Sequence, residues 1–148
     1  MFGFCKELSV TIFTDVSTNN CPPDGKEFKV TATVKAVTEN GACPVKVSFY
    51  ESRLIDRLID QDEVTVGPGA GTAAKTFLLK CKGPKCVISG NKGTSKENEM
   101  EGYVYAEDAS TIGVLTAKSS KINLSCVPIV PDDDDLKIKK IKLSKPAS

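Results

Sequence analysis

Residues 27–37 alternate between polar and apolar side chains without a break, and no other feature constrains the fold of this chain as strongly. Successive side chains of a β-strand point to opposite faces, so a period of two gives a strand one buried and one solvent-facing side. Turn-forming sequences flank the segment, Pro22-Pro23-Asp24-Gly25 before it and Glu39-Asn40-Gly41 after it. The apolar members, which we expect in a core, are Phe28, Val30, Ala32, Val34 and Ala36.

The same alternation recurs in further short segments, and no segment has the period of a long helix. The other expected strands are 7–16, 45–50, 64–66, 74–79, 102–107 and 116–125, the last with a change of phase near Ser120. Short strands at this spacing, separated by turns such as Gly67-Pro68-Gly69-Ala70-Gly71, are typical of an all-β sandwich or barrel. Phe28, Phe49 and Phe77 fall on the apolar faces of their strands, so we expect them in the core.

Two segments do not follow this pattern. Residues 53–60 repeat Arg-Leu-Ile-Asp twice, which is a helical spacing, but eight residues form only a marginal helix. An irregular edge strand and a single helical turn are equally compatible with this segment. Residues 82–99 are rich in Gly, Lys, Ser and Asn, and we expect them to form a long, mobile loop.

Composition excludes several function classes. The chain has no histidine, so a Ser or Cys nucleophile would need a Lys or carboxylate base, and we expect no enzyme. Lys and Arg number 20 against 19 Asp and Glu, which is not the charge of a nucleic-acid-binding protein. No apolar stretch approaches the roughly 20 residues of a membrane span.

Six cysteines in loop-like contexts favour disulfides and an oxidising compartment. A zinc site has less support because only Cys81 and Cys86 are close in sequence, and free buried thiols are the other alternative. Residues 1–5 carry no secretion leader, so we consider a removed leader, a virion component or a hyperthermophile protein. The predicted location is extracellular, on a cell surface or in a virion.

The order of these features resembles the bacterial and archaeal immunoglobulin-like sandwiches, in particular the adhesion-related CARDB type. Three segments carry the resemblance over roughly residues 7–126: Asp24–Val34, Pro44–Tyr50, and the turn Val66–Gly71 before Lys75-Thr76-Phe77. The resemblance implies an antiparallel immunoglobulin-like sandwich of about seven strands that is non-catalytic. The chain departs from immunoglobulin domains proper, because no cysteine lies on the second strand and the core has no tryptophan.

An up-and-down course through the sandwich predicts which cysteines meet. Cys5 and Cys43 then lie at one pole, and the other four, Cys21, Cys81, Cys86 and Cys126, lie at the opposite pole. Bridged Cα atoms lie within about 7 Å, so bridges between the poles are excluded and Cys5–Cys43 is common to every remaining arrangement. Among these we favour Cys81–Cys86 with Cys21–Cys126, since Gly83-Pro84 can turn the chain between Cys81 and Cys86.

Candidate binding residues are few. Four carboxylates, Asp56, Asp60, Asp62 and Glu63, gather within eight residues and are candidate calcium ligands, although they lack a specific calcium-loop spacing. Asn123-Leu124-Ser125 is a glycosylation acceptor sequence, and the strand pattern turns Asn123 outward. Sugars stack on exposed aromatic rings, for which Tyr50, Tyr103 and Tyr105 are the candidates.

The C-terminal residues suggest a strand separate from the main domain. We divide the chain into a sandwich (1–126), a Pro/Asp linker (127–135) and a basic-aliphatic strand (136–148). Leu136, Ile138, Ile141 and Leu143 alternate with lysines, with one extra residue at Lys139-Lys140 that a β-bulge would absorb. This strand would pair with its own sheet or with the edge of a neighbouring copy.

Two function classes follow from these observations. The first is a structural or adhesive module that self-assembles as a homo-oligomer or larger assembly, with no cofactor. The alternative is an accessory module that binds calcium or carbohydrate through loop carboxylates and tyrosines.

Overall fold

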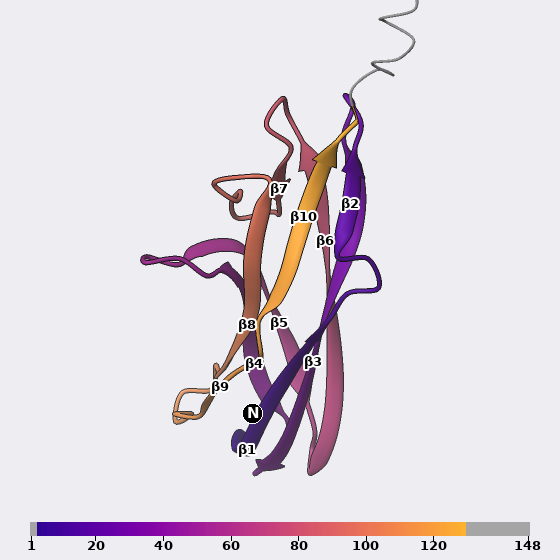
Figure 1. The fold of residues 1–148 in the computed structure, drawn as a ribbon. Coiled ribbons are helices and arrows are strands. Elements are labelled where there is room, and N and C mark those ends of the chain that lie inside the picture. Colours follow the sequence, from indigo (N-terminus) through magenta and orange to yellow (C-terminus); the bar gives the residue numbers. More distant parts are fainter. Residues whose placement is uncertain (1–2, 130–148) are drawn as a thin grey trace, which may run out of the picture.

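The computed structural model describes residues 3–129, which form ten β-strands (Figure 1). The strands are β1 (Phe4–Phe13), β2 (Thr18–Cys21), β3 (Lys26–Glu39), β4 (Cys43–Glu51), β5 (Arg57–Val66), β6 (Ala70–Lys82), β7 (Val87–Ser89), β8 (Glu99–Asp108), β9 (Thr116–Lys118) and β10 (Ile122–Pro128). Within residues 3–129, no helix is long and apolar enough to cross a membrane.

The strands form two sheets that pack face to face (Figure 1). The four-stranded sheet has the order β1-β3-β6-β7, and the six-stranded sheet has the order β2-β10-β8-β4-β5, with β9 also paired to β8. All pairs are antiparallel except β10 with β2. The prediction of an all-β sandwich is confirmed. The strands are more numerous than expected because β2 and β7 are too short to show a period, and because the 116–125 segment is divided.

The break in the 116–125 segment lies where the alternation changes phase. Residues 119–121 separate β9 from β10. The buried Ser119 continues the pairing with β8 by other means: its backbone N–H donates to Val104 O at 2.9 Å, and its Oγ accepts from Val104 N at 2.9 Å. The phase change therefore marks a point where a side-chain hydroxyl replaces part of a strand's hydrogen bonding.

The core lies between the sheets, on the faces that the alternation predicts. The five apolar residues of the 27–37 segment are buried, and so are Phe49 and Phe77. Phe49 of β4 and Phe77 of β6 stack across the two sheets with ring centroids 6.2 Å apart. Gly102 of β8 lies under Phe49, where a Cβ would come within 2.7 Å of the ring. The absence of a side chain at Gly102 thus allows the aromatic pair to fit.

Each of the three disulfides joins one sheet to the other. Cys5 of β1 is bonded to Cys43 of β4 at the lower end of Figure 1. At the upper end, Cys81 of β6 is bonded to Cys126 of β10, and Cys21 of β2 is bonded to Cys86 in the turn after β6. The Cys5–Cys43 prediction and the division of the six cysteines between two poles are confirmed.

The other two predicted pairings, Cys81–Cys86 and Cys21–Cys126, are wrong. In the β6–β7 hairpin Cys81 is paired with Ile88, so Cys86 lies in the turn beyond the strand, where its N–H donates to Gly83 O. The Cys81 side chain points into the core toward β10. Cys21 lies opposite Pro128, two residues past Cys126, because β2 runs parallel to β10.

Residues 53–60 and 82–99, which do not follow the alternating pattern, adopt different structures. In the Arg-Leu-Ile-Asp repeat, the second copy begins the edge strand β5, with a register shift opposite Phe49 and Tyr50, and the first copy forms a loop. The irregular edge strand was therefore the right alternative for residues 57–60. The 82–99 segment contains β7 and packs against β5, since the N–H groups of Lys92 and Gly93 both donate to Ile59 O.

Candidate functional site

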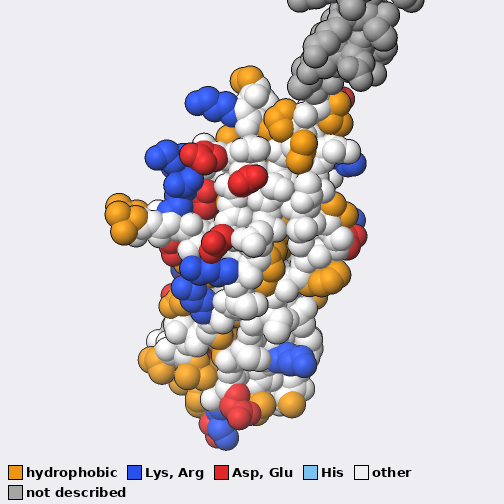
Figure 2. All heavy atoms as spheres, in the orientation of Figure 1, with side chains coloured by type: hydrophobic (Ala, Val, Ile, Leu, Met, Phe, Trp, Pro, Cys, Tyr) orange, Lys and Arg blue, Asp and Glu red, His pale blue; other side chains and the backbone are white. Residues whose placement is uncertain are grey.

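The β4–β5 loop, residues 52–56, projects from the side of the sandwich and ends in two aliphatic side chains. Leu54 is fully exposed and Ile55 is 83% exposed. Figure 1 shows the loop extending to the left of the sheets, and Figure 2 shows hydrophobic atoms at its tip. Loop tips are usually polar, and a projecting apolar tip is therefore a candidate contact site.

Hydrogen bonds at the base of the loop fix its conformation. The backbone N–H of Arg53 donates to Asp56 Oδ1 at 2.8 Å, which closes the turn around Leu54 and Ile55. Ser52 N donates to the backbone oxygen of Glu101 in β8 at 2.8 Å. The hydroxyl of Tyr103, also in β8, donates to Asp56 Oδ2. Both ends of the loop are thus hydrogen-bonded to β8.

Tyr103 links the loop to its neighbours. Its ring stacks on that of Tyr50 with centroids 5.5 Å apart, and Lys118 Nζ of β9 lies 4.2 Å from its centroid. Burial, together with the hydrogen bond to Asp56, raises the pKa of Tyr103 above its usual range. The same hydrogen bond, followed by the one from the Arg53 backbone, lowers the pKa of Asp56 below the usual aspartate value.

Beneath the loop, Glu51 is a buried carboxylate with only 1% of its surface exposed. Its oxygens lie 3.0 Å from Arg53 Nε and 3.7 Å from Arg57 Nε, and it accepts a hydrogen bond from the backbone of Lys96. Arg57 also donates to Thr94 O at 3.1 Å. A buried charge needs such partners, because removing them leaves it uncompensated in a poorly solvated position. Glu51 therefore fixes the side chains on both sides of the loop.

The predicted calcium ligands do not come together. Asp56 faces Tyr103, and Glu63 lies opposite Lys46 in the strand register. Asp60 and Asp62 line a common depression, but Asp60 Oδ1 accepts from Gln61 N and Asp62 is paired with Lys75 Nζ of β6 at 2.6 Å. The Asp62–Lys75 pair crosses from one sheet to the other at their open edges.

Over residues 3–129, one trio of side chains has the composition and spacing of a metal site: Cys5, Cys43 and Asp108. The two sulfurs are bonded to each other, which removes them as thiolate ligands. The Asp108 carboxylate accepts from Cys5 N at 2.7 Å and from the backbone and hydroxyl of Ser110. Asp108 therefore connects β1 to the β8–β9 loop, which is a structural role.

Two sequence predictions concern β10 and the residues that follow it. Asn123 is exposed on β10, as the glycosylation prediction requires, and the modification itself stays a prediction. The strand residues Leu136, Ile138, Ile141 and Leu143 lie outside the described residues, as does most of the proposed linker. The three-part division of the chain therefore stays a prediction as well.

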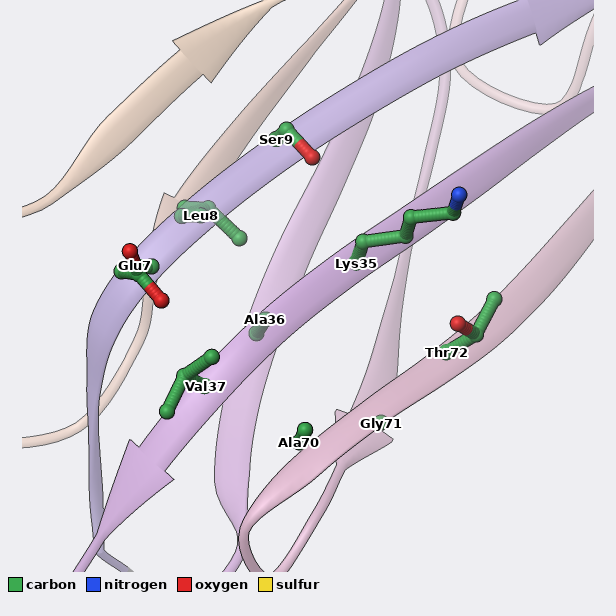
Figure 3. Close-up of a pocket in the computed structure, with 9 residues that line it drawn as sticks. All are labelled: Glu7, Leu8, Ser9, Lys35, Ala36, Val37, Ala70, Gly71 and Thr72. Atoms are coloured by element: carbon green, nitrogen blue, oxygen red, sulfur yellow. The ribbon is translucent and has the colours of Figure 1, made fainter.

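A hollow of about 610 Å³ lies on the four-stranded sheet, over β1, β3 and β6. Figure 3 shows its lining residues, with Leu8 and Ala36 turned behind the strands. The polar groups of Glu7, Ser9, Lys35 and Thr72 come from three neighbouring strands and do not converge on one point (Figure 3). The hollow is an open stretch of sheet surface, whereas small-molecule sites are concave and enclose their ligands.

Comparison with known proteins supports the fold alone. No family model and no curated protein sequence matches the chain. A β-glucosidase from Listeria innocua, solved with glucose, is similar over 84% of this chain with 14% identity and a TM-score of 0.50. The CARDB domain of a Pyrococcus furiosus protein, solved with di-metal ions, has 19% identity and a TM-score of 0.49, covering 86% of this chain and 92% of that domain. A β-glucosidase from Erythrobacter marinus is 14% identical over 82% of this chain, with a TM-score of 0.48.

The chain spans only 16% of the length of the Listeria enzyme and 15% of the Erythrobacter enzyme. The likeness to the Listeria enzyme, at 14% identity, concerns the fold alone, and a shared fold does not assign an activity.

The Glu51 cluster and the Asp56–Tyr103 contact were missing from the sequence interpretation. One signal was present for the first of them, because both arginines of the chain, Arg53 and Arg57, lie within six residues of Glu51. No signal indicated the second, since Tyr103 is 47 residues away from Asp56 and only the pairing of β4 with β8 brings them together.

We predict that replacing Tyr103 with Phe raises the pKa of Asp56 toward the ordinary aspartate value, because the main donor to its carboxylate is lost. In the native protein the folded-state pKa is the lower one, so the stabilisation is present above the ordinary pKa. It is lost as the pH falls through the folded-state value. An NMR titration of the Asp56 carboxyl carbon measures this shift. Tyr105→Phe is the matched control and should leave Asp56 unchanged; an unchanged Asp56 pKa in Tyr103→Phe would contradict the prediction.

Proposed function

We propose that this chain is a non-catalytic structural or adhesive module of the extracellular space, a cell surface or a virion. In this proposal it self-assembles when the C-terminal strand of one copy, residues 136–143, pairs with a neighbouring copy. The observation that carries the proposal is a long unpaired edge on the four-stranded sheet.

That edge belongs to β6. On one side β6 pairs with β3 along residues 70–81, and on the other side only Lys80, Cys81 and Lys82 pair, with β7. Within the described part of the chain, residues 70–79 therefore have no strand on that side. They carry a single charged side chain, Lys75. An unpaired, weakly charged edge is a template to which another strand can add.

The neighbouring edge of the other sheet, β5, is charged and partly covered. β5 carries Asp60, Asp62 and Glu63, and the 90–93 segment covers its first residues through the hydrogen bonds to Ile59 O. Charges and covering loops are the usual means by which proteins block strand addition at an edge. β6 is therefore favoured over β5 as the acceptor, and β1, the other unpaired edge of the four-stranded sheet among the described strands, carries two charged residues, Lys6 and Glu7.

The donor strand follows from the sequence and from the place where the described chain ends. Cys126 is bonded to Cys81, with their Cα atoms 5.8 Å apart, so β10, the last described strand, lies against the end of β6 that β7 covers. Four aliphatic residues alternate with lysines in this segment, which is the pattern of a strand with one apolar face. Pairing with the β6 edge of the same copy is the competing arrangement, and the experiments below distinguish the two.

Two further observations support the rest of the proposal. Three disulfides are typical of proteins in oxidising compartments. The non-catalytic part of the proposal is supported at Ser119, a serine two residues before Lys121. Its hydroxyl is buried and donates to Ser120 O, which is a structural role. The calcium and carbohydrate alternative has weaker support, because its carboxylates are dispersed and Tyr50 and Tyr103 stack on each other.

We predict that deleting residues 132–148 leaves a folded domain that no longer oligomerises, because the sandwich core lies within the remaining residues. Light scattering measures the mass of the full and truncated chains, and circular dichroism reports whether the truncated chain folds. If the full chain is a monomer at high concentration, self-assembly is wrong; if truncation unfolds the domain, the strand belongs to its own sheet.

We also predict that Ala74→Lys on β6 weakens self-association. Ala74 is exposed on the unpaired edge, and a lysine there would repel the lysine-rich donor strand. Thr11→Lys on β1 is the matched control, because Thr11 and Ala74 flank Thr33 in the same cross-strand row but lie on opposite edges of the sheet. Equal loss of association in both variants, measured by sedimentation velocity, would contradict β6 as the acceptor.

A further inference from the structure

We propose that the β4–β5 loop is a membrane-docking tip that inserts Leu54 and Ile55 among the headgroups of an anionic lipid surface. This inference concerns a different surface from the β6 edge and does not depend on self-assembly.

The Arg-Leu-Ile-Asp repeat shows that the exposure of this tip is particular to the first copy. In the second copy Leu58 is half-buried and Ile59 is completely buried in the core. The same two residue types in the first copy, Leu54 and Ile55, contribute nothing to the core. Burying such side chains is favourable, so their exposure leaves apolar area available for burial against something outside the molecule.

The tip is presented in a fixed conformation. The Asp56 carboxylate accepts from the backbone of Arg53 and from Tyr103, and the buried Glu51 lies between Arg53 and Arg57. A loop held in place before binding loses less conformational entropy when it inserts. These contacts also leave both aliphatic side chains directed away from the sandwich, at a convex point that can enter a lipid interface (Figure 2).

The side chains directly beside the apolar tip are mainly cationic. Arg53, Arg57 and Lys96 line the surface next to Leu54 and Ile55, and Asp56 is the one carboxylate in that lining. Both arginines are paired with Glu51, which is buried. In Figure 2 Lys and Arg side chains lie above and below the tip, with acidic side chains next to them. Cations beside an inserted apolar group strengthen binding to anionic lipids.

A second apolar loop projects toward the same side. The β8–β9 loop carries Ile112 and Val114, which are 66% and 86% exposed, and Figure 1 shows it to the lower left. Lys118 of β9, which follows this loop, contacts Tyr103, and Tyr103 contacts Asp56 of the β4–β5 loop. Two apolar points with cations between them would orient the sandwich on a lipid surface, with the β4–β5 tip as the main point of insertion.

The test is co-sedimentation of the full, oxidised chain with vesicles of phosphatidylcholine, with and without phosphatidylserine. We expect binding to the vesicles that contain phosphatidylserine, weakened by high salt. The variant Leu54→Ser/Ile55→Ser should bind these vesicles at least about tenfold more weakly, because two aliphatic side chains no longer enter the interface. The matched control Phe13→Ser/Leu78→Ser removes two exposed apolar side chains from the outer face of the four-stranded sheet and should bind like the native chain.

Absence of native binding to phosphatidylserine vesicles would overturn the proposal, and so would equal binding by the tip variant. If the tip variant instead lowers the mass of the protein without vesicles, the tip contacts a second copy and the lipid proposal is wrong. Circular dichroism confirms that each variant is folded. Self-assembly is tested separately, by deleting residues 132–148. Failure of one proposal therefore does not decide the other.

Discussion

The sandwich depends on three covalent connections between its sheets, which stand at both ends of the molecule. The bridges close chain segments of 38, 65 and 45 residues. In the chain-entropy account, each bridge lowers the entropy of the unfolded chain and so stabilises the folded state by about 4 kcal/mol. Between them, Phe49 and Phe77 stack across the interface. Because the two sheets are covalently joined at both ends, they cannot separate there. The sandwich can therefore have a projecting loop and an unpaired edge while its core stays packed.

Edges and loops then distinguish the surfaces of this frame. The β5 edge is charged and covered, whereas residues 70–79 of β6 are unpaired and nearly uncharged. The Asp62–Lys75 ion pair joins these two edges across the open side of the sandwich. At the six-stranded sheet, Glu51, Asp56 and Tyr103 hold the β4–β5 loop in one conformation, with its aliphatic residues outward.

The alternation of residues 27–37 was sufficient to predict β3, its buried face and the sandwich class, because period and burial are local properties of a strand. It was insufficient for β2 and β7, which have four and three residues. The Arg-Leu-Ile-Asp repeat places identical sequences in a loop and in a strand, and only pairing with β4 separates the two. The Asp56–Tyr103 contact likewise depends on which strands are neighbours. The cysteine pairs at the upper end failed for the same reason, since the parallel β2 and the β6–β7 register were unknown.

The most direct test of this account is a disulfide map of the unreduced protein. Trypsin cleaves after Lys82 and Lys85 and so separates Cys81 from Cys86, which allows every pairing to be assigned by mass spectrometry. The structure predicts three linked peptide pairs, joining Cys5 to Cys43, Cys21 to Cys86 and Cys81 to Cys126. A peptide pair that joins Cys81 to Cys86, or free thiols at these positions, would contradict a sandwich fastened across its two sheets at both ends.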